Sequence, residues 1–232
     1  MTLVREASEG LTHLFFPHAC RSCGFPLGNR KTFLCFTCKA SLPCTGFEAY
    51  PGNPVEKIFY GRIPVAAASA YLFFNAGSAT QQLIHQIKYK DDPELAKNLG
   101  RLMGKALASN NRFTQLDAIV PLPLFRNRER QRGYNQAGKL AEGIAEMLQI
   151  PAKADLVKRI RATETQTHKN RTERWQNVEG LFKISPHTIV RHQHLLLVDD
   201  VITTGATLEA CATALLDEGA TVSVATLAFA MK

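Results

Sequence analysis

The residues with the clearest chemical capability lie in one stretch, LLLVDDVITTGATL, at positions 195–208. Four apolar residues lead into the paired acids Asp199 and Asp200. The apolar run predicts a buried parallel strand, because such a strand needs no polar alternation. The hydroxyl-rich turn that follows comprises Thr203, Thr204, Gly205, Ala206 and Thr207. Helical spacing over 208–216 then places this turn at a helix N-terminus, where Gly205 is free to adopt a positive φ.

This arrangement favours a phosphorylated sugar. Free backbone N–H groups and the positive end of the helix dipole attract a phosphate, and threonine hydroxyls can donate further hydrogen bonds to it. Asp199 and Asp200 only accept hydrogen bonds when ionised, so they suit sugar hydroxyls or a Mg²⁺ ion. A phosphate beside a diol describes a 5-phosphoribosyl ligand. The alternative is an ordinary strand–turn–helix whose threonines cap the helix.

Four cysteines near the N-terminus have metal-site spacing. They form the pattern C-x2-C-x11-C-x2-C and are Cys20, Cys23, Cys35 and Cys38. Two such knuckles complete a tetrahedral zinc site, and four thiolates make it structural because catalytic zinc keeps a position open. Reduced cysteines or two disulfides are the alternatives, and disulfides fit a cytoplasmic chain poorly. Cys44 and Cys211 are predicted to be small buried apolar residues.

Two basic segments supply further candidates for anion binding. The first, at 122–136, carries an arginine at every second position: Arg126, Arg128, Arg130 and Arg132. In a helix this spacing spreads the side chains around the axis, whereas an extended loop places them on one side. Pyrophosphate or a nucleic-acid backbone could meet them, and a solvated surface loop is the third interpretation.

The second basic segment, at 158–177, is a long loop between two short strands. Its candidates are Arg159, Arg161, Lys169, Arg171 and Arg174. Nearly twenty structureless residues in a compact domain are unusual unless they are functional or mobile. Basic residues beside Trp175 also suit single-stranded nucleic acid, although a packing role for Trp175 is equally consistent.

The whole chain points to anionic partners. It has 232 residues and a formal net charge of +8, which favours phosphates or nucleic acid without choosing between them. No apolar run approaches the length of a membrane span. The N-terminal stretch contains Glu6 and Glu9 and lacks the long apolar core of a secretory signal. We therefore expect a cytoplasmic protein.

The elements that must position these residues alternate between strands and helices. Strands are predicted at 65–74, 117–122, 154–157, 181–184, 195–202 and 221–229, and helices at 78–88, 93–108, 133–148 and 208–216. This order predicts an α/β fold with a parallel sheet, in which ligands bind beyond the carboxyl ends of the strands. We expect an N-terminal helix and zinc ribbon over 1–45, a Pro- and Gly-rich linker over 46–62, and one domain over 63–232.

Taken together, the motifs resemble the ComF family of competence and DNA-utilisation proteins, which includes the GntX-like proteins. The matching pieces are the four-cysteine module, VPLPLFRNRERQRGYNQA, RIRATETQTHKNRTERWQNVEGLF and LLLVDDVITTGATLEA, in the order of the family. The resemblance implies a zinc ribbon fused to a type I phosphoribosyltransferase-like domain that binds phosphoribosyl pyrophosphate (PRPP). It implies that Asp199 and Asp200 meet the ribose hydroxyls, that 203–207 holds the 5-phosphate, and that the 158–177 loop closes over PRPP.

Two functions follow from this resemblance. In the first, the pocket serves the uptake or use of single-stranded DNA in natural competence, with DNA and a competence helicase as partners. The alternative is an active phosphoribosyltransferase, in which PRPP binds with Mg²⁺ and a nucleobase or other acceptor displaces pyrophosphate. Such catalysis would be chiefly electrostatic, and the sequence designates no residue as a base.

Overall fold

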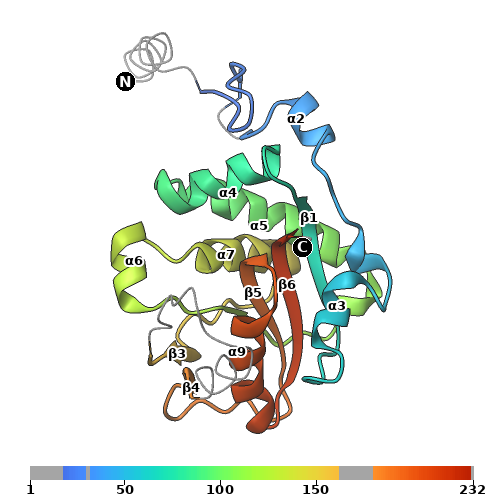
Figure 1. Cartoon of the computed structure of the whole chain (residues 1–232), viewed down its shortest axis with the longest axis vertical. Helices are drawn as coiled ribbons and strands as arrows, with labels where there is room; N and C mark the ends of the chain where they lie inside the picture. Colours follow the sequence, from blue (N-terminus) through green and yellow to red (C-terminus); the bar gives the residue numbers. More distant parts are fainter. Residues whose placement is uncertain (1–17, 30–31, 162–179, 231–232) are drawn as a thin grey trace.

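A four-stranded parallel sheet forms the centre of the protein (Figure 1). The computed structural model describes residues 18–29, 32–161 and 180–230. The strands lie in the order β1 (Ala68–Phe74), β6 (Thr221–Ala230), β5 (His194–Ile202) and β2 (Ala118–Pro121). Their sequences are nearly continuous apolar runs, as expected for strands covered on both faces. The predicted parallel α/β sheet is confirmed.

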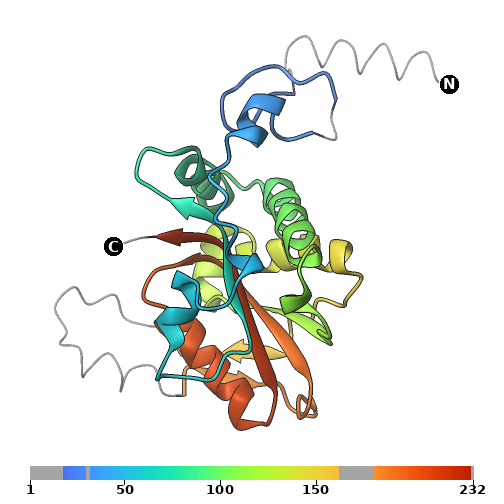
Figure 2. The same cartoon turned by 90° about the vertical axis from the view of Figure 1, so that its right-hand side faces the viewer.

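Helices cover both faces of the sheet and bury one apolar cluster on each. On one side, Leu196 and Val198 of β5 pack with α4 (Ala79–Tyr89), α5 (Pro93–Ala108) and α7 (Gln136–Leu148). On the other side, Leu195 and Leu197 pack with α3 (Pro54–Phe59) and α9 (Ala206–Asp217). Figure 2 shows these two layers from the side. Neighbouring β5 residues face opposite layers because side chains alternate along a strand.

Helices α5 and α7 approach each other closely because glycines line their contact. A Cβ atom added at Gly100 would lie 2.2 Å from the carbonyl oxygen of Leu140, and one at Gly143 would lie 2.0 Å from that of Lys97. No side chain fits at those distances. The pair therefore depends on glycine for its spacing, and α7 is held in place against the sheet edge that carries the candidate site.

The segment predicted as a linker packs as part of the sheet domain. Residues 46–62 contain a 3₁₀ turn, η1 (Phe47–Ala49), and helix α3, in which Val55 and Phe59 are completely buried. Asn53 caps α3 by accepting hydrogen bonds from the N–H groups of Val55 and Glu56 at 3.0 and 3.1 Å. Prolines and glycines suggested a linker, but here they bound a short capped helix.

Three further short elements differ from the predicted pattern. The strands β3 (Val157–Arg159) and β4 (Phe182–Ile184) pair antiparallel with each other and form a separate two-stranded sheet. A helix, α6 (Arg126–Arg132), follows β2, and α7 begins only at Gln136. Both differences lie at the edge of the sheet, where they flank the candidate site.

The cysteine module lies beside α4 (Figure 2). It contains helix α2 (Phe36–Ala40), and Leu34 and Leu42 join the apolar cluster formed by α4 and α5. Arg21 Nε lies 2.9 Å from Asp92 Oδ2 at the start of α5. The predicted N-terminal helix falls in residues 1–17, outside the described residues. Within the described part of the chain, no helix combines the length and apolarity needed to cross a membrane.

Candidate functional site

The loop 203–207 joins the carboxyl end of β5 to the N-terminus of α9. Gly205 has φ of 72° and precedes the helix without a side-chain capping hydrogen bond. Thr203 and Thr204 are exposed and Thr207 is half-buried. None of their hydroxyl groups hydrogen-bonds to another residue in the parts of the chain that the structure describes. The hydroxyls and the first N–H groups of α9 are thus available to an anion, and the capping role considered for the threonines is not observed.

The acid pair lies at the carboxyl end of β5, next to this loop. Burial, with the adjacent charge of Asp200, raises the pKa of Asp199 to about 8. The backbone N–H of Asp200 donates to Asp199 Oδ1 at 2.8 Å. Asp200 Oδ2 lies 2.9 Å from the ammonium group of Lys88, in the last turn of α4. Two crowded carboxylates suit a hard cation or a diol, because either would stabilise their charge.

Arg62 links the loop to α3 through hydrogen bonds. Its Nη1 donates to the carbonyl oxygens of Ile58 and Thr204 at 2.9 and 3.0 Å, and its Nη2 pairs with Glu209. The Thr204 carbonyl is therefore occupied. The Glu209 charge, in the first turn of α9, is balanced by a cation that approaches from the α3 side. This leaves the positive N-terminus of the helix more favourable to an anion.

Gly205 allows the loop to lie directly against α3. A Cβ atom at this position would lie 2.6 Å from Ile58 Cγ2 and 3.2 Å from Phe59 Cε1. Both the positive φ and the lack of space require glycine. The segment predicted as a linker is therefore one wall of the candidate site.

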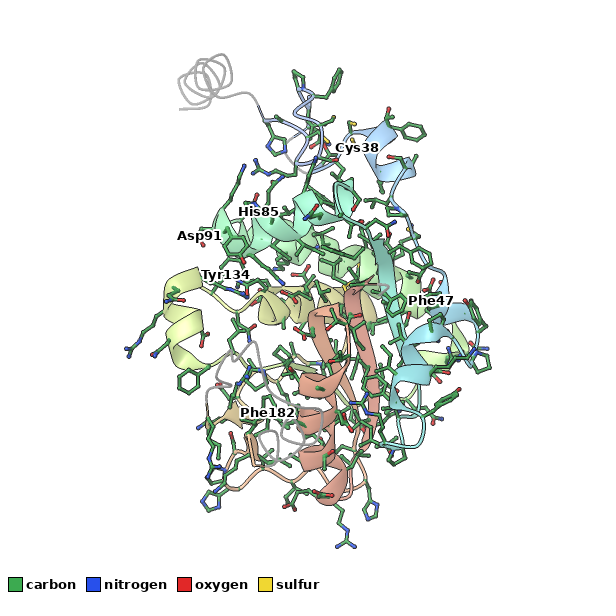
Figure 3. The ribbon with its side chains drawn as sticks, in the orientation of Figure 1. Cys38, Phe47, His85, Asp91, Tyr134 and Phe182 are labelled. Carbon is green, nitrogen blue, oxygen red and sulfur yellow. The ribbon has the colours of Figure 1, made fainter. Side chains whose placement is uncertain are left out.

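The four alternating arginines lie on a helix rather than in an extended loop, and a helical backbone does not bring every second position to one side. All four belong to α6, which ends at Gly133 with φ of 76°. Arg130 is exposed, and Arg132 donates to Gln136 Oε1 at 2.8 Å. The hydroxyl of Tyr134 donates to the carbonyl oxygen of Ile87 at 2.5 Å and ties the start of α7 to α4 (Figure 3). Helix α6 thus starts from the same sheet edge as the acid pair.

The second basic segment is described only at its start. Arg159, in β3, lies with its guanidinium 5.6 Å from the centre of the Phe182 ring, a cation–π contact, and Nε donates to the Arg161 carbonyl at 3.3 Å. Arg161 is exposed. The remaining candidates of this segment, Lys169, Arg171 and Arg174, and the neighbouring Trp175, lie outside the described residues.

The four cysteines of the N-terminal module are brought together. Their sulfur atoms all lie within 4.8 Å of one another, and Cys23 Sγ and Cys35 Sγ are 3.8 Å apart. Tetrahedral zinc with bonds of about 2.3 Å implies sulfur separations of about 3.8 Å. The Cys35 N–H donates to Cys20 Sγ at 3.3 Å, and all four are free thiols, so the disulfide alternative is wrong. These residues could hold a structural zinc.

The two remaining cysteines differ in their exposure to solvent. Cys211 is buried as predicted, but Cys44 is exposed, so its predicted burial is wrong. Cys44 forms an isolated β-bridge to Leu72 of β1.

Three residues near the site escaped the sequence prediction: Arg62, Lys88 and Glu209. Arg62 lay in the presumed linker, and Lys88 looked like an ordinary polar residue of an amphipathic helix. Only the tertiary fold brings them to the loop and the acid pair. Glu209 follows a common pattern, an acidic residue in the first turn of a helix. That pattern predicts the start of a helix but does not mark a binding site.

Sequence comparisons match most of the chain to known proteins. Residues 85–232 match the family described as "Phosphoribosyl transferase domain". The DNA utilization protein YhgH of Salmonella typhi is 30% identical over 221 residues, covering 89% of this chain and 94% of that protein. Competence protein F of Haemophilus influenzae is 36% identical over 130 residues, covering 54% and 57%.

Among solved structures, the glutamine PRPP amidotransferase from B. subtilis is 21% identical with a TM-score of 0.42, covering 61% of this chain and 30% of that one. The assignment rests on the sequence matches, which confirm the predicted resemblance. The chain belongs to the phosphoribosyl transferase domain family, within the ComF group of DNA-utilization and competence proteins.

Proposed function

We propose that the chain binds a 5-phosphoribosyl ligand, PRPP, together with Mg²⁺ at the junction of β5 and α9. The observation that carries the proposal is the open N-terminus of α9 and its uncommitted threonine hydroxyls, beside a crowded acid pair. A phosphate suits the helix N-terminus and the threonine hydroxyls, and a diol with a divalent cation suits the acid pair. A single ligand that combines these groups is a ribose 5-phosphate derivative.

Each part of the site would contribute one interaction. Asp199 and Asp200 would accept hydrogen bonds from the ribose hydroxyls or coordinate Mg²⁺, which supplies positive charge beside the pyrophosphate. Thr203, Thr204 and Thr207 would donate to the 5-phosphate, together with the N–H groups of Gly205 and Ala206. The arginines of α6 would face the pyrophosphate or a nucleic-acid backbone, and so would Arg159 and Arg161.

We further propose that this pocket serves the uptake or use of single-stranded DNA. The names of the relatives, DNA utilization protein and competence protein, support this role. The net charge of +8 is consistent with a polyanionic partner. A competence helicase is the proposed protein partner. A zinc ion bound by the four cysteines would stabilise the fold of the N-terminal module, which lies beside α4.

Phosphoribosyl transfer is the second candidate, favoured by the presence of both halves of the site. An acceptor such as a nucleobase would attack the anomeric carbon, the bond to pyrophosphate would break, and pyrophosphate would leave with the bonding electron pair. Pyrophosphate release from PRPP in the presence of candidate bases tests this reaction.

The binding proposal is tested through its phosphate half. Calorimetry should show that ribose 5-phosphate binds the wild type and binds a Thr203→Ala, Thr207→Ala variant more weakly. The expected loss is about 1.5–3 kcal/mol for each hydrogen bond to the charged phosphate. Thr221→Ala, an exposed threonine at the opposite end of the sheet, is the matched control and should bind as the wild type does. Equal binding by all three proteins would refute the assignment of the phosphate to this loop.

A further inference from the structure

We infer that Lys88 exchanges one anionic partner for another when the ligand binds, from the carboxylate of Asp200 to the phosphates of the ligand; we call this the charge exchange. In the structure its ammonium group pairs with the carboxylate of Asp200. When a divalent cation and a sugar phosphate bind together, the cation takes its place and Lys88 turns to the phosphates. The inference rests on the proposed function of the β5–α9 junction and concerns how that site selects its ligand.

The contact between Lys88 and Asp200 is short and largely withdrawn from water. Lys88 Nζ lies 2.9 Å from Asp200 Oδ2, and the two side chains are only 21% and 13% exposed. Exposed Lys–Asp pairs contribute little because water and salt screen them. This pair is less screened, so the ammonium group substantially offsets the negative charge at the end of β5.

The direction of Lys88 is fixed by its helix. Leu83, Ile84 and Ile87 are buried on the face of α4 that packs on the core. The carbonyl of Ile87 accepts the hydrogen bond from Tyr134 at 2.5 Å, which holds the last turn of α4 against the start of α7. Figure 3 shows Tyr134 in this position between the two helices. Lys88 is therefore presented to the acid pair by a rigid element, while its own stem can still rotate.

The two cations compete for the same carboxylate. Mg²⁺ binds through carboxylate oxygens, and an ammonium group has only donors, so it gains nothing from a neighbouring cation. A cation that arrives alone must displace Lys88 and leave it without an anion. A cation that arrives with a sugar phosphate supplies a new anion for Lys88, whose flexible four-carbon stem allows the movement. Lys88 thus disfavours the bare cation and favours the complete ligand.

A purely structural role would look different. If the ion pair only attached α4 to β5, its removal would loosen the site and weaken every ligand. The charge-exchange role predicts opposite changes for two ligands. Lys90 provides a matched control, because it is the exposed residue that ends the same helix.

The test compares Lys88→Met with Lys90→Met, since methionine keeps the apolar stem and removes the charge. Two affinities are measured for each protein: Mn²⁺ alone, by electron paramagnetic resonance, and PRPP in saturating Mg²⁺, by calorimetry. Lys88→Met should bind Mn²⁺ about tenfold tighter, because the competing ammonium group is absent. It should bind PRPP about tenfold weaker, because one charged hydrogen bond to the phosphates cannot form. Lys90→Met should match the wild type in both.

The outcomes separate the inference from the proposed function. If the wild type binds PRPP and Lys88→Met changes neither affinity, or lowers both together with the unfolding temperature, the Lys88 inference is overturned and the proposed function stands. If the wild type binds no PRPP, the proposed function and the inference fall together. Tighter Mn²⁺ binding with weaker PRPP binding supports the charge exchange.

Discussion

At the scale of single residues, the two acids of β5 are unlike each other although they are adjacent. Asp200 has a cationic partner in Lys88, whereas burial and the Asp200 charge raise the pKa of Asp199 to about 8. Two buried carboxylates side by side are unfavourable by themselves, because their charges are held close together with little water. Binding of a cation would remove that cost, which is a common feature of functional sites.

Asp199→Asn should make the stability of the protein less dependent on pH. The folded pKa of about 8 lies above the unfolded value of about 3.9, so the folded state binds an extra proton between them. Stability from this group is therefore present below pH 4 and is lost as the pH rises through 8. Asparagine does not titrate. From pH 5 to pH 9 the wild type should therefore lose on the order of 4 kcal/mol of stability relative to the variant, about 1.4 kcal/mol for each pH unit up to pH 8.

Urea denaturation at the two pH values measures this difference. Asp217→Asn, at the far end of α9, is the control, because Asp217 is exposed and has no side-chain hydrogen bond or ion pair within the described residues. The same pH dependence in Asp199→Asn and wild type would show that Asp199 is ionised in the folded protein throughout this range.

The sequence could identify the acids and the loop because their order along the chain is itself the signal. It could not identify Lys88 or Arg62. A lysine in an amphipathic helix and an arginine in a Pro- and Gly-rich segment carry no local mark of their partners. Those partners, Asp200 and the Thr204 carbonyl, lie far away along the chain and meet them only in the tertiary fold.

At the scale of elements, long periodic segments were predictable and short ones were not. Helix α5 begins and ends at the predicted residues, and β6 differs by one residue. Strands β3 and β4 have three residues each, too few to fix a pairing partner from their pattern. Helix α6 has no apolar face to give periodicity, so its arginines were equally compatible with a loop.

The packing of α5 on α7 gives a prediction at this scale. Gly143→Ala should destabilise the protein by about 1–3 kcal/mol or more, because its Cβ would lie 2.0 Å from the Lys97 carbonyl and the helices would have to separate. Gly138→Ala, on the same helix, is the matched control. Its Cβ meets only ordinary contacts at 3.5 Å, so this variant should be neutral or up to about 1 kcal/mol more stable. Thermal unfolding of both variants measures this difference, and equal effects would contradict the role of the close approach.

At the scale of the whole molecule, the cysteine module and the candidate site share one helix. Gln86 of α4 donates a hydrogen bond to the carbonyl oxygen of Arg21 in the module, and the same helix carries Lys88 (Figure 1). The sequence could predict both units from their motifs. Their contact depends on Leu34 and Leu42, which have no distinctive spacing.

We predict that the protein binds single-stranded DNA through basic residues that include the arginines of α6. Affinity should fall with salt, with a logarithmic slope of about −0.7 per phosphate neutralised. Replacing Arg126, Arg128, Arg130 and Arg132 by Ala should flatten that slope. If these arginines bind only the pyrophosphate group, the variant instead loses PRPP binding, and the wild type does not bind oligonucleotides even at low salt. Fluorescence anisotropy with a labelled oligonucleotide distinguishes the two cases.

Binding of PRPP at the junction of β5 and α9 is tested by calorimetric titration of PRPP with Mg²⁺. Three proteins are titrated: the wild type, the Asp199→Asn, Asp200→Asn double variant and the Asp217→Asn control. We predict that the wild type and the control bind with equal affinity and that the double variant binds at least about tenfold more weakly, since it loses charged hydrogen bonds to the ligand. A wild type that does not bind PRPP, or a double variant that binds it as tightly as the wild type, would contradict the claim.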